Sequence, residues 1–596
     1  MRADIKDILL TVDKPARYAG GEFNTPVIKA DAALRFLMCF PDVYEVAHSN
    51  LGIKILYYML NQRADTACES CYMPWVDMAE RLRANGLPLF SQETQTPMRS
   101  FHAVGFSLQY EMSYTNVLAM LDLGGIPVLC ADRGEQDPIV VAGGPCVINP
   151  MPLTKFIDVF SIGDGEEAIS QLADTLIRCK REKRSRAQTL QEIARIDGMF
   201  VPSVSQGKVR RAVIDSLETA FFPTKVQIPS IEAVFQRAVL EIFRGCTRGC
   251  RFCQAGMIYR PVRERTPQTL RKYTQELIEN NGFDEITLSS LSTCDYPCLR
   301  RLLAEIKPIC DERHVNISLP STRVDSFEAE FVASGRLSSM TFAPEAGTQR
   351  LRDVINKNVT EEDILTSCRY AFEKGFHSVK LYFMIGLPTE TDEDLYGIAD
   401  IVKKIKYCYK THAVSRKPLS LGVSTSTFVP KPFTPFQWEA QISLEEIERR
   451  QSLLRAALKP LGIRYNYHDG KTSRLEATLA RGDERMNDVI AAAYASGCVF
   501  DSWTEHFDYE KWMAAFASCG VDPETYCGAQ DMGAPRAWER IETGISREFL
   551  LREREKAYKG ELTKDCRKGC NACGIHKEYP SAFRANCCGG EGGGQC

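Results

Sequence analysis

The 596-residue chain is too long for a single hydrophobic core and predicts roughly three or four domains. Its composition, 44% hydrophobic and 25% charged with a formal net charge of -3, is that of an ordinary globular protein. These values exclude a strong overall field for nucleic acid or acidic membrane. No stretch approaches the roughly 18 consecutive apolar residues of a membrane span. The N-terminal MRADIKDILLTVDK is charged where a signal peptide needs an apolar core, so we expect a cytoplasmic location.

The first 200 residues contain repeated strand, turn and helix patterns. The segments AVGFSLQYEMSYTNVLAMLDLGGIPV, PIVVAGGPCVINP and IDVFSIGDGEEAISQLADTL predict a doubly wound, Rossmann-like domain over residues 1–200. Gly143 and Gly144 follow one predicted strand, while Gly163 and Gly165 precede Glu166 and Glu167 at the start of a helix. Glycines at such turns let the backbone approach a nucleotide-like ligand closely.

A connector over residues 201–235 follows this domain. The preceding charged run RCKREKRSR is better explained as a solvated helix end than as an RNA-binding element. Pro202, Pro223 and Pro229 then interrupt regular structure.

The 23 cysteines divide into isolated residues and clusters. In a reducing compartment, clustered thiols are more often metal ligands than disulfides. Isolated cysteines are interpreted as small buried hydrophobes: Cys39, Cys130, Cys146, Cys179, Cys310, Cys368, Cys408, Cys498, Cys519 and Cys527.

The first cluster lies in AVLEIFRGCTRGCRFCQAG, where a predicted strand ends in a glycine-rich loop. Cys246, Cys250 and Cys253 have C-x3-C-x2-C spacing, which allows three thiolates to converge and leaves one iron of a cluster open. The alternative is zinc, but no fourth Cys or His follows at the spacing of a structural zinc site.

This motif, with the aromatic Phe252 just before its last cysteine, resembles the signature of radical S-adenosylmethionine (SAM) enzymes. The resemblance implies an oxygen-sensitive four-iron four-sulfur cluster whose open iron binds SAM and whose electron generates a 5'-deoxyadenosyl radical. It also implies a small electron-donor protein of the flavodoxin or ferredoxin type. The cofactor would supply the chemistry, and the protein would supply orientation and a dry cavity.

Alternating strand and helix patterns over residues 236–438 predict the core. Six predicted strands look like the partial (β/α)6 barrel of radical SAM proteins: 239–243, 285–289, 316–319, 339–343, 378–384 and 419–428. The family resemblance places SAM contacts at the ends of these strands, at Ser290, Ser321, Arg323, Glu345, Met384 and Gly386.

Each of these positions also has a structural explanation. Ser290 belongs to an ordinary serine-rich turn, Ser321 is suited to capping a helix beside a solvated Arg323, and Glu345 is suited to a helix start. The turn after Met384 precedes a helix with Thr389 or Thr391 as its predicted cap.

The order of the N-terminal units resembles the cobalamin-binding domain that precedes many radical SAM cores. The D-x-H-x-x-G motif that supplies a cobalt ligand is absent, and EVAHSNLG places His48 before Gly52 without the Asp. Two alternatives therefore stay open: bound cobalamin, or a Rossmann-like domain put to another use.

A helix-rich region is predicted over residues 439–560, followed by a Cys-rich tail over 561–596. Two interpretations are open for Lys431 and Trp438, which either face a substrate or pack internally. The polar and aromatic residues that follow are interpreted as helix surface or as part of a substrate site: His468, Asp469, Glu476, Arg481, Asp483, His506 and Trp512. In the tail, Cys566, Cys570 and Cys573 repeat the C-x3-C-x2-C spacing. This second site suits an iron-sulfur cluster or zinc, with His576, Cys587, Cys588 or substrate as a further ligand.

The whole arrangement resembles a radical SAM family with an N-terminal cobalamin-binding-like domain. It predicts reductive cleavage of SAM followed by methyl or sulfur transfer to an unidentified substrate, with RNA and protein both open and no membrane partner. The alternative is a non-catalytic iron-sulfur scaffold or RNA-associated factor.

Overall fold

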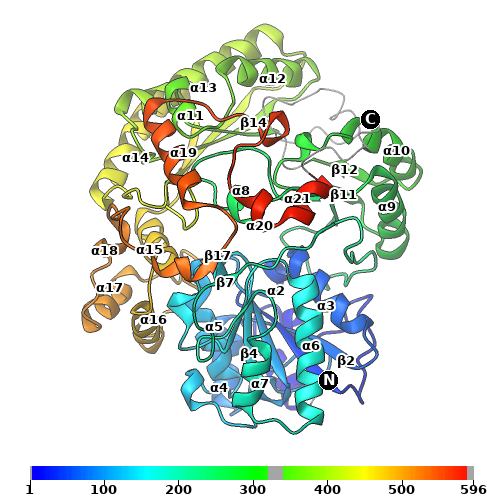
Figure 1. Ribbon diagram of the computed structural model, residues 1–596. Helices are drawn as coiled ribbons and strands as arrows, with labels where there is room; N and C mark the ends of the chain where they lie inside the picture. Colours follow the sequence, from blue (N-terminus) through cyan, green and yellow to red (C-terminus); the bar gives the residue numbers. More distant parts are fainter. Residues whose placement is uncertain (1–2, 320–339, 587–596) are drawn as a thin grey trace.

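The computed structural model describes residues 3–319 and 340–586 (Figure 1). The N-terminal part is built on one six-stranded sheet in the order β2-β1-β3-β4-β5-β6. All neighbouring strands are parallel except β5 and β6. The strands are β1 (Leu34–Phe40), β2 (Thr66–Tyr72), β3 (Ala103–Ser107), β4 (Ile139–Gly143), β5 (Val159–Ser161) and β6 (Met199–Phe200).

Helices cover both faces of this sheet, which confirms the doubly wound architecture. One face packs against α3 (Leu51–Gln62), α6 (Gly165–Arg181) and α7 (Arg186–Ile193). The opposite face packs against α4 (Val76–Ala84) and α5 (Tyr114–Leu123). The strand order reverses between β1 and β3, so a crevice is expected there at the carboxyl edge of the sheet.

The central core contains two parallel sheets. One has the order β12-β11-β8 and the other β13-β14-β15-β16. Their strands are β8 (Ala238–Glu241), β11 (Glu285–Ser289), β12 (Asn316–Ser318), β13 (Met340–Glu345), β14 (Ser378–Ile385), β15 (Ser420–Thr427) and β16 (Arg464–Tyr467).

All six predicted core strands are present within one or two residues of their predicted limits. The sequence analysis missed β16, which pairs in parallel with β15 and carries the sheet past residue 438, where the predicted core ended. The burial pattern of Arg464–Tyr467 explains the omission, because this edge strand has no buried residue and therefore no apolar signal.

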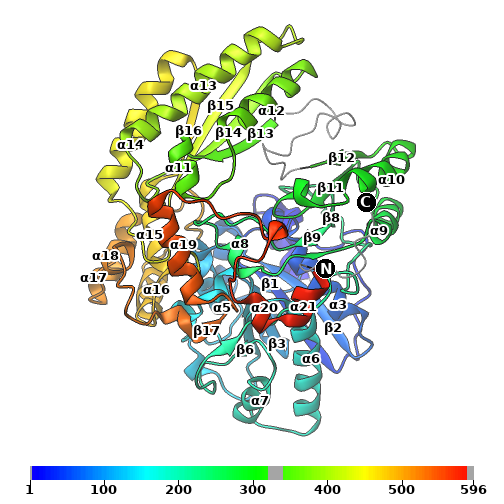
Figure 2. The same cartoon turned by 45° about the horizontal axis from the view of Figure 1, so that its top comes forward.

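Helices cover the outer faces of the core sheets (Figure 2). Four of them begin at Thr or Ser N-caps whose side chains accept a backbone N–H, namely Thr266, Thr348, Thr360 and Ser443. Thr391 is the N-cap of α13, as predicted, and its N–H donates to Asp394 at 2.9 Å. The helices are α9 (Pro267–Asn281), α10 (Leu299–Glu312), α11 (Gln349–Val354), α12 (Glu361–Glu373), α13 (Asp392–His412) and α14 (Leu444–Leu458).

The C-terminal region returns to the two preceding parts. Helices α16 (Met486–Ala495) and α17 (Tyr509–Ser518) contribute to the same buried core as α4 and α5. Strand β17 (Ile541–Glu542) pairs with β7 (Val209–Arg210) of the connector. In Figure 1, α19 (Arg547–Lys559), α20 (Ile575–Glu578) and α21 (Pro580–Asn586), in red, cross the centre of the molecule. None of the described helices is both long and apolar enough to cross a membrane.

Candidate active site

The loop with Cys246, Cys250 and Cys253 follows the first core strand. It leaves β9 (Phe243–Arg244), passes through α8 (Ala255–Ile258) and returns in β10 (Arg263–Glu264), which pairs with β9. Gly245 has φ +93°, and a Cβ there would lie 2.7 Å from the carbonyl oxygen of Tyr259. Only glycine therefore fits at the start of the loop.

Electrostatic coupling places the three thiols of this loop near one another. Burial and, after it, the neighbouring Cys250 raise the pKa of Cys246 to about 12 and that of Cys253 to about 11. Bound metal would supply the positive charge that these thiols need to ionise. Within the described ranges, no three His, Cys, Asp or Glu side chains are gathered as a single ion requires. A four-iron cluster takes each thiolate on a separate iron, so its ligands are spread more widely.

Phe252 and Met384 belong to one buried apolar cluster, which joins the cysteine loop to the end of β14. Gly386 follows that strand with φ +81°, and its N–H donates to the Glu390 carboxylate at 2.6 Å. A Cβ at Gly386 would lie 2.9 Å from Ile442. The tight turn after β14 thus lies beside the cysteine loop.

Glu345 ends β13 in a left-handed conformation, with φ +68°. This conformation is strained for a residue other than glycine and is most often retained at functional positions. Its carboxylate pairs with Lys357 at 3.0 Å, and both charges influence the Cys253 thiol. Glu345 therefore lies beside the cysteine loop. The sequence analysis missed Lys357, because no motif links it to the cysteines.

Of the three remaining predicted SAM contacts, the structure describes only Ser290. The hydroxyl of Ser290 lies 3.1 Å from that of Thr293, just beyond the end of β11. Ser321 and Arg323 lie outside the described residues.

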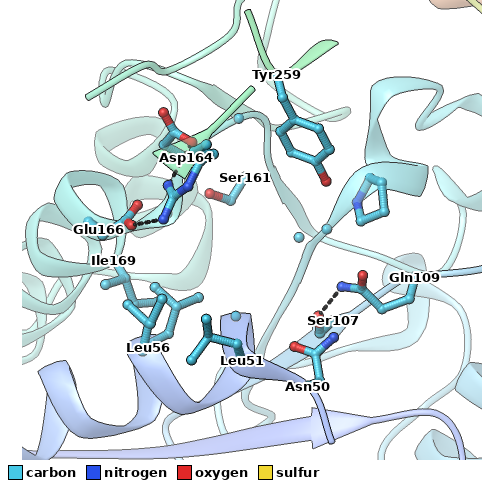
Figure 3. Close-up of a pocket in the computed structure, with 18 of the residues that line it drawn as sticks. Asn50, Leu51, Leu56, Ser107, Gln109, Ser161, Asp164, Glu166, Ile169 and Tyr259 are labelled. Atoms are coloured by element: carbon cyan, nitrogen blue, oxygen red, sulfur yellow. Dashed lines mark hydrogen bonds and ion pairs between the residues drawn. The ribbon is translucent and has the colours of Figure 1, made fainter. Parts of the chain in front are cut away.

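A cavity of about 440 Å³ separates the carboxyl edge of the N-terminal sheet from the first core strands (Figure 3). Leu51, Leu56 and Ile169 form an apolar wall, while Asn50 and Gln109 supply amides elsewhere (Figure 3). Its lining also includes the predicted turn residues Gly143, Gly144, Gly163, Gly165 and Glu166, and, from the core, Glu241, Phe243, Arg244, Gly245, Tyr259, Ser289, Ser290 and Leu291.

Arg244 joins the two parts of the chain at one side of this cavity. Its guanidinium lies 2.9 Å from Asp164, 2.8 Å from Glu166 and 3.0 Å from Glu241. Burial alone would raise the pKa of Asp164, but Arg263 and Arg244 hold it well below its usual range. The charged network therefore fixes the N-terminal sheet against the cysteine loop. Nothing local in the sequence predicts this pairing, because Arg244 and Asp164 are 80 residues apart.

His48 does not line the cavity. Its ring is only 4% exposed, and Nε2 lies 3.3 Å from the hydroxyl of Tyr72. Burial lowers the pKa of His48 to about 3, so the ring is neutral. His48 is therefore a buried packing residue, which agrees with the absence of the D-x-H-x-x-G motif from the sequence.

Lys431 lies between two carboxylates that the sequence does not connect. Its Nζ is 2.8 Å from Glu111 and 2.8 Å from Glu476, and Tyr110 donates to Glu476 at 2.9 Å. The ion pairs join the N-terminal part, the end of the core and α15 (Gly470–Ala480). Lys431 is thus an internal link between regions.

Most of the polar group after Trp438 also makes internal contacts. His468 lies 2.9 Å from the hydroxyl of Ser473, Arg481 donates to the Glu439 carbonyl at 2.8 Å, and Trp512 donates to Asp501 at 2.9 Å. Trp438 itself is 2% exposed. These contacts favour the packing interpretation over the substrate-site one.

The C-terminal cysteine motif lies directly against the first. The backbone N–H of Cys566 donates to the carbonyl of Thr247, next to Cys246, at 3.1 Å. Cys573 is buried, whereas Cys570 is exposed. The sequence identified both motifs but gave no sign that they meet.

Two family models match the chain. One, described as radical SAM proteins, N-terminal, matches residues 52–202, and the radical SAM superfamily model matches residues 240–402. The two regions correspond to most of the N-terminal sheet and to the core up to α13.

Curated relatives include an uncharacterised protein of Methanocaldococcus jannaschii, 29% identical over 72% of this chain and 88% of the relative. A tRNA-2-methylthio-N(6)-dimethylallyladenosine synthase of Desulforamulus reducens is 26% identical over 29% of this chain and 40% of that enzyme. An anaerobic magnesium-protoporphyrin IX monomethyl ester cyclase of Cereibacter sphaeroides is 22% identical over 52% of this chain and 49% of that enzyme. The chain thus matches less than half of each of these two enzymes.

Among solved structures, the chain is similar to a radical S-adenosylmethionine methyltransferase, TsrM, of Kitasatospora setae, with cobalamin and a [4Fe-4S] cluster bound. The match has 15% identity and a TM-score of 0.48, and covers 68% of this chain and 77% of that one.

Proposed function

This chain belongs to the radical SAM superfamily, and from that premise we propose that it cleaves SAM reductively at a four-iron four-sulfur cluster held by Cys246, Cys250 and Cys253. The observation that carries the proposal is the meeting of the cysteine loop with the ends of β13 and β14. Glu345 influences the Cys253 thiol, and Phe252 packs in the same cluster as Met384. Three ligands and a neighbouring polar surface are what an open iron and its substrate require.

The residues of this region have separate tasks in the proposal. The Glu345 carboxylate, held by Lys357, binds the ribose or amino group of SAM, and the backbone around Met384 and Gly386 holds the adenine side. Phe252 closes the loop against the core and excludes water. Ser290 contributes a hydroxyl, while Ser321 and Arg323 remain predicted contacts that lie outside the described residues.

We propose that the cavity between the N-terminal sheet and the core binds cobalamin, because the residues that line it suit this cofactor. Its glycine turns allow close approach, its apolar wall suits a ring face, and Asn50 and Gln109 suit the amides of the ring's rim. When bound, the cluster supplies an electron to the sulfonium of SAM, and cobalamin supplies a cobalt centre able to carry a methyl group. His48 would not hold the cobalt, because it lies outside the cavity lining.

Methyl transfer to an unidentified acceptor is therefore the reaction that we propose. Ser290 and its neighbours line the cobalamin cavity and also follow the core strand β11. The proposed SAM and cobalamin sites are thus adjoining spaces within one enzyme, which holds the reacting groups close together.

The test of SAM cleavage uses anaerobically reconstituted protein, dithionite and chromatography for 5'-deoxyadenosine. We expect product from the wild type and at least about a hundredfold less from Cys250→Ala, because the cluster supplies the electron. A wild type that holds an intact cluster but binds no SAM would contradict the proposal and favour the scaffold alternative.

The test of cobalamin binding fills the cavity. Ser161→Phe should weaken cobalamin binding at least about tenfold, because its ring occupies cavity space and overpacking is unfavourable; absorption spectroscopy after gel filtration measures this. The matched control is Cys250→Ala, which should lose the cluster and keep the cobalamin. Equal cobalamin binding by wild type and Ser161→Phe, with the cluster intact in both, would argue against this cavity.

A further inference from the structure

The second cysteine motif is fixed to the first by a short polar network. Besides the bond from Cys566 to Thr247, the hydroxyl of Thr247 donates to Asp565 at 2.9 Å. Arg248 lies 3.3 Å from the same Asp565 carboxylate. Backbone contact at residue 247 places the two sets of thiols on adjoining loops.

Arg260 lies within electrostatic reach of both sets of thiols. It is 4% exposed, and its Nε and Nη2 donate to the carbonyls of Gly256 at 2.9 Å and Arg248 at 3.1 Å. Its Nη1 is buried without a hydrogen-bond partner in the part of the chain that the structure describes. Its charge interacts with the thiols of Cys566, Cys573 and Cys246. A fixed cation near both motifs suits two anionic centres, and its remaining N–H groups suit an acceptor sulfur.

The candidate fourth ligand of the second motif is His576. Nδ1 of His576, three residues after Cys573, is buried and has no hydrogen-bond partner among residues 3–319 and 340–586. An unpaired buried ring nitrogen is costly unless something binds it. Zinc would need its four ligands gathered around one point, which the described residues of this motif do not provide. A cluster accepts the wider arrangement.

The outer side of this motif is exposed and basic. Cys570 lies at the surface, and Lys564, Arg567 and Lys568 around it are exposed as well. Arg552, also exposed, donates to the carbonyl of Asn571 at 2.8 Å. Within residues 562–573 every exposed charged side chain is basic, whereas the exposed acids Glu548 and Glu555 lie on α19 beside Arg552, and Glu561 and Glu578 lie outside the loop. The positive charge is in excess, so the surface is complementary to an acidic protein.

From these contacts we propose that Cys566, Cys570, Cys573 and His576 hold a second iron-sulfur cluster that receives electrons from an acidic one-electron donor protein and passes them to the first cluster. This role rests on the proposed SAM cleavage. The donor reduces the second cluster by one electron, and the second cluster is reoxidised as it reduces the first. That electron then enters the sulfonium of SAM, whose S–C5' bond breaks to give methionine and the 5'-deoxyadenosyl radical.

The metal content of wild type and Cys570→Ala tests the site itself. Cys570 is exposed, so its replacement should leave folding intact. Wild type should take up about eight irons per chain and Cys570→Ala about four, with a reduced-state electron paramagnetic resonance signal broadened by coupling in wild type alone. Stoichiometric zinc in the isolated protein, or equal iron in both proteins, would overturn the proposal. Neither measurement requires SAM cleavage, so the second cluster can be confirmed or refuted independently of the proposed function.

The donor surface is tested with Lys564→Glu/Lys568→Glu and, as a control of equal charge change, Lys403→Glu/Lys410→Glu on α13. With reduced flavodoxin at low salt, the first variant should form 5'-deoxyadenosine roughly tenfold more slowly than wild type, and the control less than about twofold more slowly. With dithionite, all three should react equally, because a small reductant needs no protein surface. Equal flavodoxin rates for the two variants would overturn the role in electron delivery.

Discussion

The cysteine motifs at 246–253 and 566–573 have identical spacing but are fixed in the fold by different means. The first follows a core strand, begins at a glycine with φ +93° and is closed by Phe252 in an apolar cluster. The second has an exposed middle cysteine and is fixed by polar contacts from Asp565 and Arg567. Spacing alone therefore predicts which cysteines act together, while the surroundings decide how rigid and how accessible each loop is.

The largest expected difference between the motifs follows from a substitution that the backbone conformation of the first motif does not tolerate. Gly245→Ala places a Cβ 2.7 Å from the Tyr259 carbonyl in a conformation that alanine disfavours. We expect a cost of roughly 3 kcal/mol or more and at least about a tenfold loss of iron at the first site, measured by denaturant unfolding and iron analysis after reconstitution.

The matched control is Gly282→Ala, at φ +69° with open space around the added Cβ. It should cost about 1 kcal/mol and leave the iron content unchanged. A similar iron loss in both variants would mean that the first loop is not specially constrained.

A smaller effect is expected from the charge beside the first motif. Lys357→Met removes the partner that holds Glu345 at 3.0 Å, so the dissociation constant for SAM should rise by roughly tenfold, measured by equilibrium dialysis of the reconstituted protein. Lys357→Arg keeps the charge and should restore most of the affinity. Unchanged affinity in Lys357→Met would remove Glu345 from the binding site.

The stability of the second cysteine loop is expected to depend on ion pairs and hence on pH. Burial alone would raise the pKa of Asp295, but Arg248 and then Arg567 bring it to about 2. Since the ordinary Asp pKa is about 3.9, the stabilisation is fully present above about pH 4 and disappears as the pH falls towards 2.

Asp295→Asn should therefore free the second loop at neutral pH, at a cost of about 1–3 kcal/mol. Hydrogen exchange of residues 561–573 measures this, and exchange in the variant should lack the wild-type rise in acid. If the variant protects these residues as well as wild type does, ion pairing is not what fixes the second motif.

The smallest effect is expected outside both motifs. Cys519, one of the isolated cysteines, is half-buried and adjoins the apolar core. Cys519→Ser should change neither the iron content nor the SAM cleavage rate, and stability should fall by about 1 kcal/mol or less. Loss of iron in this variant would mean that ligands had been overlooked.

Much of the core could be predicted because its signals are local. Buried parallel strands such as Ser378–Ile385 contain apolar runs, and Thr391 with Asp394 forms a helix start within four residues. Strand Arg464–Tyr467 lacks a buried face, so only its pairing with β15 reveals it.

The sequence by itself determined the family signature, both cysteine motifs and the alternation of strands and helices, because each depends on residues close together in the chain. Only the tertiary structure decided that Cys566 meets Thr247, that Arg260 interacts with thiols of both motifs, and that Lys431 joins Glu111 to Glu476. These pairings span tens to hundreds of residues and follow from how whole sheets and helices pack, which no local periodicity records.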